Sequence, residues 1–209
     1  MIKAILFDAG GVILDLDLDR CRNAFKTVLG YDRIDQLLDP CHQKGIYGDM
    51  EEGKITAEEF ADAVLAESRE GSTPEMVDFC MAALLGGIQP AKAEFIKTLA
   101  ARGYELYLLT NNNEISWAHF QRIFRDAGIP IEDTFKQSFL SCRIGALKPD
   151  PAIFRHMLDS VGLSPDEVLF IDDSASNAAA AAGLGFNSLH YIVGTDLAQL
   201  VESALQNRA

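Results

Sequence analysis

The chain has 209 residues, and 48% of them are hydrophobic, so it can bury a full core as one domain or as one domain with a sizeable insertion. Its formal net charge of -13 argues against nucleic acid as a partner, because affinity for the phosphate backbone comes from Lys and Arg side chains that displace counterions. An anionic substrate must therefore be met by positive charge that is local to its site.

The cysteines are scattered and form no Cys-x-x-Cys pair, which indicates neither a zinc cluster nor a secreted disulfide framework. They are Cys21, Cys41, Cys80 and Cys142. We therefore expect a reducing, cytoplasmic location. The N-terminal apolar run is interrupted by Asp8 and is too short to cross a bilayer, so neither a targeting segment nor a membrane partner is expected.

The first predicted element is a buried strand over residues 2–7, which ends at Asp8 and is followed by the turn-forming pair Gly10 and Gly11. Later apolar runs have the same character, at residues 104–110, 168–171 and 187–193, with a weaker strand candidate at 137–141. Helix-like stretches separate these runs. The alternation predicts an α/β fold, a Rossmann-like, doubly wound parallel sheet covered by helices.

A long segment between the first two strands, residues 18–85, shows helical periodicity and no convincing strand. Thr56 is expected to be the N-cap of one helix, with Glu59 completing a capping box. Pro74 is expected at the first position of another helix. The segment is therefore predicted to be a packed helical insertion above the carboxyl edge of the sheet.

This insertion divides the chain into an all-α helical cap at residues 17–86 and a catalytic core at residues 1–16 and 87–209. Asp17 or Asp19 is expected to cap the first helix, and a metal site in this acidic run is the less favoured alternative. Some polar cap residues are candidates for reaching the substrate, although an exposed structural role is favoured for each of them. These are Arg20, His42, Lys44 and Tyr47.

Carboxylates gather at the predicted carboxyl edge of the sheet, where ligands bind in open parallel α/β folds. Asp8 ends the first strand, and the pair Asp172 and Asp173 ends a later one. Carboxylates that are forced together repel one another unless a cation is present, which indicates a hard, oxygen-ligated metal. Mg²⁺ is the expected cofactor.

Other polar residues at this edge suit a phosphoryl group. Thr110 and Asn111 end the second strand, and Lys148 lies in the loop after the weaker strand. Lys148 is expected to place positive charge beside Asp8. The Thr110 hydroxyl, the Asn111 amide and the free N–H groups at the start of the helix near Glu114 are expected to hold phosphoryl oxygens.

In this order, the residues resemble the haloacid dehalogenase superfamily, and the resemblance spans nearly the whole chain. The motifs that carry it are Phe7-Asp8-Ala9-Gly10-Gly11-Val12, Leu109-Thr110-Asn111, Lys148-Pro149 and Phe170-Ile171-Asp172-Asp173-Ser174, followed by Asn177. Four ordered motifs make the match specific. The resemblance implies that the helical insertion is a cap that closes over the substrate and excludes water.

The resemblance also implies roles for individual residues. Asp8 would be the nucleophile and a metal ligand, with the Gly10 carbonyl, Asp173 and Asp172 completing the metal site directly or through water. The expected catalytic residues are Asp8, Thr110 and Lys148, and the expected contacts to the substrate are Gly11, Thr110, Asn111 and Lys148.

One position departs from the family pattern. Family phosphatases commonly carry a second aspartate two residues after the nucleophile as a general acid and base, and this chain has Gly10 there. A positioned acid typically contributes about 100-fold or more to the rate. The same Asp-x-Gly pattern occurs in a subgroup of small sugar-phosphate phosphatases, similar to glucose-1-phosphate phosphatase, and this chain resembles that subgroup.

The resulting hypothesis is an Mg²⁺-dependent phosphatase that hydrolyses a small phosphate monoester, with sugar phosphates as candidates, through an aspartyl-phosphate on Asp8. One alternative is a 2-haloacid dehalogenase, which needs no metal; by resemblance, such enzymes replace the acidic pair with neutral residues, and this chain keeps Asp172 and Asp173. A second alternative, suggested by Gly10, is a weakly active regulatory protein that binds a phosphometabolite. The sequence predicts no oligomeric state.

Overall fold

A five-stranded parallel sheet forms the centre of the molecule in the computed structural model, which describes residues 1–39 and 42–206. The strands follow the order β5-β4-β1-β6-β7, and every neighbouring pair is parallel. Their bounds are β1 Ala4–Phe7, β4 Glu105–Thr110, β5 Gln137–Leu140, β6 Val168–Asp172 and β7 Asn187–His190. All five predicted strands are present, including the weaker one.

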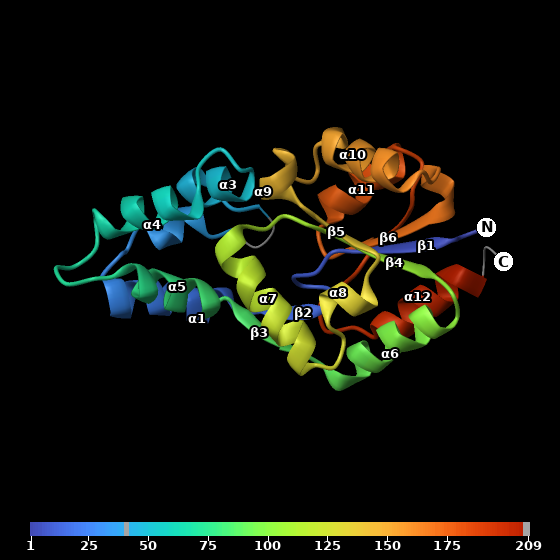
Figure 1. The fold of residues 1–209 in the computed structure, drawn as a ribbon, viewed down its shortest axis with the longest axis horizontal. Coiled ribbons are helices and arrows are strands. Elements are labelled where there is room, and N and C mark those ends of the chain that lie inside the picture. The colour runs from blue at the N-terminus through green and yellow to red at the C-terminus, as the bar shows by residue number, and fades with distance from the viewer. Residues whose placement is uncertain (40–41, 207–209) are drawn as a thin grey trace.

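Helices cover both faces of this sheet (Figure 1), as a doubly wound fold requires. On one face lie α6 (Pro90–Ala101), α7 (Glu114–Asp126) and α12 (Leu197–Gln206), and on the other α10 (Pro151–Val161) and α11 (Ala175–Gly183). Shorter turns complete the core: α8 (Ile131–Thr134), α9 (Ser141–Ile144) and the 3-10 turn η2 (Pro165–Glu167). The predicted α/β, Rossmann-like class is confirmed.

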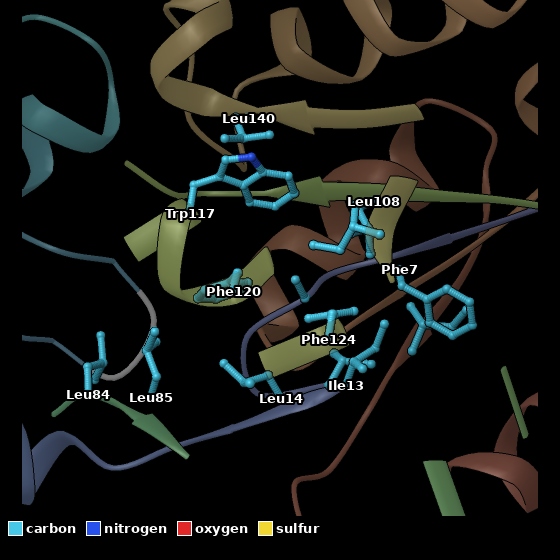
Figure 2. Close-up of a cluster of buried hydrophobic side chains, with 14 of the residues drawn as sticks. Phe7, Ile13, Leu14, Leu84, Leu85, Leu108, Trp117, Phe120, Phe124 and Leu140 are labelled. Carbon is cyan, nitrogen blue, oxygen red and sulfur yellow. The ribbon is translucent and has the colours of Figure 1, made fainter. Parts of the chain in front are cut away.

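The side chains of β1 pack in two separate apolar cores, because successive side chains of a strand point to opposite sides of the sheet. Ile5 and Phe7 belong to the larger core, whereas Ala4 and Leu6 belong to the smaller. Figure 2 shows part of the larger core, where aromatic side chains of α7 lie among apolar side chains of the strands. The sequence prediction that Trp117, Phe120 and Phe124 pack in the core is confirmed.

The described residues between 18 and 84, here called the helical segment, lie beyond one end of the sheet, away from both chain termini (Figure 1). The segment contains α1 (Leu18–Ala24), the π-helical turn η1 (Phe25–Leu29), α2 (Ile34–Leu37), α3 (Gly45–Glu51), α4 (Ala57–Leu65) and α5 (Pro74–Ala82). Its predicted caps are present. Asp17 accepts from the Arg20 N–H, Thr56 and Glu59 form a reciprocal capping box, and Pro74 begins α5.

A second, two-stranded antiparallel sheet joins the ends of the helical segment, and the sequence prediction misses it. It pairs β2 (Leu14–Leu16) with β3 (Leu85–Ile88). Short strands that contain Asp15 or two glycines carry little strand propensity. Gly86 is required there, because a Cβ at this position would lie 2.8 Å from the Asp15 carbonyl oxygen. The exact division between cap and core stays a prediction.

Within the described residues, no helix has the length and apolar character that crossing a membrane requires. The described cysteines, Cys21, Cys80 and Cys142, form no disulfide. Cys41 lies outside the described residues, so the prediction made for it is not addressed.

We expect Phe124→Ala to lower the free energy of unfolding by about 3–5 kcal/mol, because it removes a fully buried ring and leaves a cavity. The ring packs against Phe120 and Phe135. Phe79→Ala is the matched control: Phe79 is 60% exposed, so its replacement should change stability by no more than about 0.5 kcal/mol. Urea denaturation measures both values, and equal losses would contradict this account of the core.

Candidate active site

The predicted polar residues do meet at the carboxyl edge of the sheet. Asp8 follows β1, Thr110 ends β4 and Asp172 ends β6, and these three strands are neighbours in the sheet. Parallel strands present their carboxyl ends at one edge, so the strand order itself brings these side chains together. The site therefore follows directly from the fold.

Asp8, Asp172 and Asp173 each present a carboxylate oxygen, and these oxygens lie within 4.8 Å of one another. A set of oxygen donors at this spacing fits a hard divalent cation. Gly10 lines the same cavity as Asp8 and Asp173, although the role of its carbonyl as a ligand stays a prediction. The residues present therefore fit the metal that the sequence predicts.

Lys148 lies completely inside the protein, with a side-chain exposure of 0%. Its Nζ is 3.0 Å from Asp8 Oδ2 and 2.7 Å from Asp172 Oδ2, and it also donates to the Leu109 carbonyl oxygen at 2.9 Å. A buried ammonium with two carboxylate partners is well compensated. The predicted position of a positive charge beside Asp8 is thus present.

Asn111 holds the loop that carries Lys148. Its Nδ2 donates to the Lys148 carbonyl oxygen at 3.0 Å, and its Oδ1 accepts from the Lys148 N–H at 2.8 Å. The amide is therefore engaged with the main chain of the lysine. A direct contact from Asn111 to substrate stays a prediction, as it does for Thr110, which is 2% exposed and lines the cavity.

Asp172 and Asp173 have different surroundings. The Asp172 carboxylate accepts hydrogen bonds from Lys148 Nζ, from the Ser174 N–H and from Asn177 Nδ2, and it is fully buried. Asp173 is only partly buried and faces the cavity. Asp173 therefore has the more accessible carboxylate of the two for a cation, whereas Asp172 is already engaged with protein donors, and a direct metal role stays a prediction for both.

Gly11 makes room for Asp173. Its φ of +76° is a backbone conformation that favours glycine, and a Cβ at this position would lie 2.0 Å from Asp173 Oδ2. The carboxylate thus occupies the space that any other residue would need for its side chain. Whether Gly11 also contacts substrate, as the sequence predicts, is not tested by this geometry.

Burial dominates the electrostatics of the acidic cluster. Desolvation raises the pKa of Asp8 to about 8, although the Lys148 ammonium opposes the shift. Burial and the Asp172 charge raise the pKa of Asp173 to about 6. A divalent cation at the cluster would favour the charged forms, so metal binding and deprotonation of these carboxyl groups are expected to be coupled.

The cavity beside the cluster has a volume of about 70 Å³ and has walls from both parts of the chain. The core supplies the loops after β1, β4, β5 and β6, while the helical segment supplies Gln43, Tyr47, Glu51 and Leu84. The sequence prediction of an exposed role for Tyr47 is wrong, because this side chain is fully buried in the wall. Sequence reasoning missed Glu51, and only its i,i+4 spacing from Tyr47 could have placed the two on one helix face.

The other cap candidates do not line this cavity. Arg20 donates to the carbonyl oxygens of Ala83 and Leu85, and Lys44 forms an ion pair with Asp39. His42 Nε2 lies 3.0 Å from Ser176 Oγ, which joins the helical segment to the start of α11. The structural role that the sequence favoured for these residues fits their contacts.

The fold is Rossmann-like, and the carboxyl edge of its sheet carries an aspartate, a buried lysine and an acidic pair. This arrangement is that of an enzyme active site. Residues 2–185 match the family model described as haloacid dehalogenase-like hydrolase. The chain belongs to this hydrolase family.

Known relatives resemble the chain over almost its whole length. D-ribitol-5-phosphate phosphatase of Bacteroides thetaiotaomicron is 36% identical over 201 residues, which cover 95% of this chain and 96% of that protein. A HAD family enzyme from the same organism, solved with magnesium and inorganic phosphate, has a TM-score of 0.90 at 31% identity and covers 96% of this chain and 99% of its own. A predicted HAD-like family hydrolase from Porphyromonas gingivalis has a TM-score of 0.89 at 31% identity, with 99% and 98% covered.

Without a divalent cation, we expect the stability of the protein to fall as the pH rises from about 4 to about 8. The unfolded chain releases its carboxyl protons near the ordinary value of 3.8, whereas the folded chain keeps those of Asp173 to about 6 and of Asp8 to about 8. The folded state therefore binds more protons in this window, and each proton that it must release destabilises it.

Thermal denaturation in EDTA measures this dependence. Asp8→Asn should flatten the slope between pH 6 and 8, and added Mg²⁺ should raise the melting temperature of the wild type most at the alkaline end. A slope in EDTA that is the same for the variant and the wild type would refute the assignment to Asp8.

Gly11→Ala is expected to abolish the acidic site, because the new Cβ displaces the Asp173 carboxylate. Gly162→Ala is its matched control: Gly162 has a similar φ of +70° and nothing within 4 Å of the added Cβ. Both variants should lose about 1–2 kcal/mol of stability to the left-handed backbone. Only Gly11→Ala should lose Mg²⁺-induced thermal stabilisation, and equal stabilisation of both variants would count against a metal site at Asp173.

Proposed function

We propose that the protein is an Mg²⁺-dependent phosphatase that hydrolyses a small phosphate monoester through an aspartyl-phosphate on Asp8. The observation that supports this proposal most strongly is the contact of Asp8 with the buried Lys148, beside the acidic pair Asp172 and Asp173. The lysine offers positive charge at the nucleophile, and the acidic pair offers ligands for a cation.

Charge balance supports the metal. Lys148 is the one cationic side chain among the described residues that line the cavity, and it already faces Asp8 and Asp172. A phosphate monoester dianion adds further negative charge to this acidic cluster, so its binding requires another cation. Asp8, Asp173 and the Gly10 carbonyl would hold Mg²⁺, with Asp172 contributing directly or through water. The ion would neutralise charge on the phosphoryl oxygens.

The chemistry assigned to this chain has two steps. Asp8 attacks phosphorus and displaces the alcohol, and water then hydrolyses the aspartyl-phosphate. The Lys148 ammonium offsets charge on the phosphoryl oxygens in both steps. Asn111 keeps the lysine loop against the end of β4, so that this charge is in place before substrate binds.

A sugar phosphate or sugar-alcohol phosphate is the substrate class that we favour. The relative that matches 95% of the chain is a D-ribitol-5-phosphate phosphatase. The cavity walls beside Asp8 carry amide, hydroxyl and carboxyl groups, which suit the hydroxyls of such a substrate. The acidic pair Asp172 and Asp173 also favours a phosphatase over a 2-haloacid dehalogenase, because a reaction that needs no metal does not require these metal ligands.

A cytoplasmic location remains part of the proposal. The described cysteines are free thiols, which fits a reducing compartment.

We expect Asp8→Asn to lower phosphatase activity by roughly 10³-fold or more, because the amide is no nucleophile toward phosphorus. The assay is release of phosphate from ribitol 5-phosphate, glucose 1-phosphate and p-nitrophenyl phosphate, each with Mg²⁺ and with EDTA. Asp19→Asn, at an exposed residue that is ion-paired with Arg22, is the matched control and should retain wild-type activity.

Activity that survives in Asp8→Asn would refute the mechanism. A wild-type protein that binds Mg²⁺ and phosphate esters without turnover would instead support the regulatory binding protein. Halide release from 2-chloropropionate without Mg²⁺ would support the dehalogenase.

A further inference from the structure

The proposed reaction needs a proton donor that the loop after β1 does not supply. When Asp8 displaces an alcohol from phosphorus, the departing oxygen must gain a proton or leave as an alkoxide. Gly10 has no side chain with which to donate one. A protein side chain that donates this proton must therefore come from another wall of the cavity.

The geometry of in-line displacement indicates which wall of the cavity lies near the departing oxygen. The departing oxygen lies on the side of phosphorus opposite Asp8. Asp8 stands at the sheet edge, and the helical segment, which lies beyond that edge (Figure 1), supplies the apolar Leu84 and the polar Gln43, Tyr47 and Glu51 to the cavity. Of these side chains, a glutamine donates no proton to an alkoxide. Tyr47 carries a phenol, whose ordinary pKa of about 10 makes it a far weaker acid than a carboxyl group, and burial raises the pKa of Tyr47 further. Glu51 remains.

The backbone at Glu51 is fixed against the core. Ser141 Oγ donates to the Glu51 carbonyl oxygen at 2.5 Å and accepts from the Asn112 N–H at 2.9 Å. Gly53 lies so close to the core that a Cβ there would be 2.3 Å from the Cys142 carbonyl oxygen. The end of α3 is therefore held at the loops that follow β4 and β5.

The Glu51 side chain is 8% exposed and lines the cavity, yet no hydrogen bond or ion pair to its carboxyl group occurs within the described part of the chain. A buried carboxylate without a partner is costly, so the neutral acid is the favoured form. Burial and the nearby Asp8 charge accordingly raise the pKa of Glu51 well above its usual range. A protonated carboxyl group that faces a cavity is free to donate to a ligand.

We propose that Glu51 is the general acid and base of the phosphatase, in place of the acid missing at Gly10. This proposal rests on the proposed function. In the first step, the Asp8 oxygen bonds to phosphorus, the bond from phosphorus to the substrate oxygen breaks, and the Glu51 proton passes to that oxygen to release the alcohol. In the second step, the Glu51 carboxylate accepts a proton from the water that attacks the aspartyl-phosphate, which regenerates the acid and frees Asp8.

Leaving groups of different basicity test this role. An alkyl ester such as ribitol 5-phosphate needs the acid, whereas p-nitrophenolate leaves without a proton. In Glu51→Gln, rapid-quench measurement with Mg²⁺ should show phosphoryl transfer from the alkyl ester slowed about 100-fold or more and transfer from p-nitrophenyl phosphate changed by only a few fold. Loss of the base should also slow the second step, so a burst of p-nitrophenolate should precede slow turnover. That burst shows that the variant is folded and its nucleophile intact.

Control variants separate an acid from a structural residue. Glu52→Gln changes the neighbouring carboxylate, which pairs with Lys54 and does not line the cavity, and it should behave as the wild type. Glu51→Asp keeps the acid on a shorter side chain and should recover part of the alkyl-ester rate that Glu51→Gln loses.

Equal slowing of both esters in Glu51→Gln, or a higher KM with unchanged kcat, would overturn the proposal and make Glu51 a structural or substrate-binding residue. So would a wild type that hydrolyses only the aryl ester, because no acid then assists an alkoxide. A wild type that hydrolyses neither ester refutes the proposed function first, and the role of Glu51 with it.

Discussion

The buried ammonium of Lys148 is the contact on which the site depends. It compensates Asp172, which is fully buried, and Asp8 at the end of β1. Carboxylates at this depth are costly unless a cation faces them. The loop after β5 must therefore pack onto the ends of β4, β1 and β6, because only then does Lys148 offset the cost of burying these carboxylates. Asn111 and the Leu109 carbonyl oxygen fix the lysine from two sides, so one cation sets both the register of the loop and the surroundings of the nucleophile.

Most of the core fold could be predicted from the sequence, because buried parallel strands leave continuous apolar runs that are easy to locate. The strand from Ala4 to Phe7 ends at Asp8, and the strand from Val168 runs directly into the acidic pair. Capping chemistry is equally local, so the sequence predicts Thr56 as an N-cap and Pro74 at the start of a helix, and the structure confirms both. The sequence does not predict the pair β2 and β3, because these strands contain Asp15 and two glycines and are stabilised by their pairing with each other.

The positions of some side chains at the site depend on long-range contacts, which the sequence alone does not reveal. Taken alone, Lys148 resembles an exposed lysine, and only the order of the four motifs predicts its place beside Asp8. Tyr47 and Glu51 carry no such motif. Their direction is set by where the end of α3 docks, and that depends on Ser141, which is 90 residues away in the chain. Periodicity can assign two residues to one face of a helix, but it does not show what that face meets.

The antiparallel pair of β2 and β3 holds both ends of the helical segment side by side. Because this pairing fixes the distance between the first and last residues of the segment, the segment is equivalent to a long loop inserted into the core. Lengthening such a loop adds little to the entropy cost of closing it. During evolution, such a segment can grow, shrink or be replaced while the aspartates and the lysine stay where the sheet puts them. The fold can therefore keep the residues that act on the phosphate while the surface that faces the rest of the substrate changes.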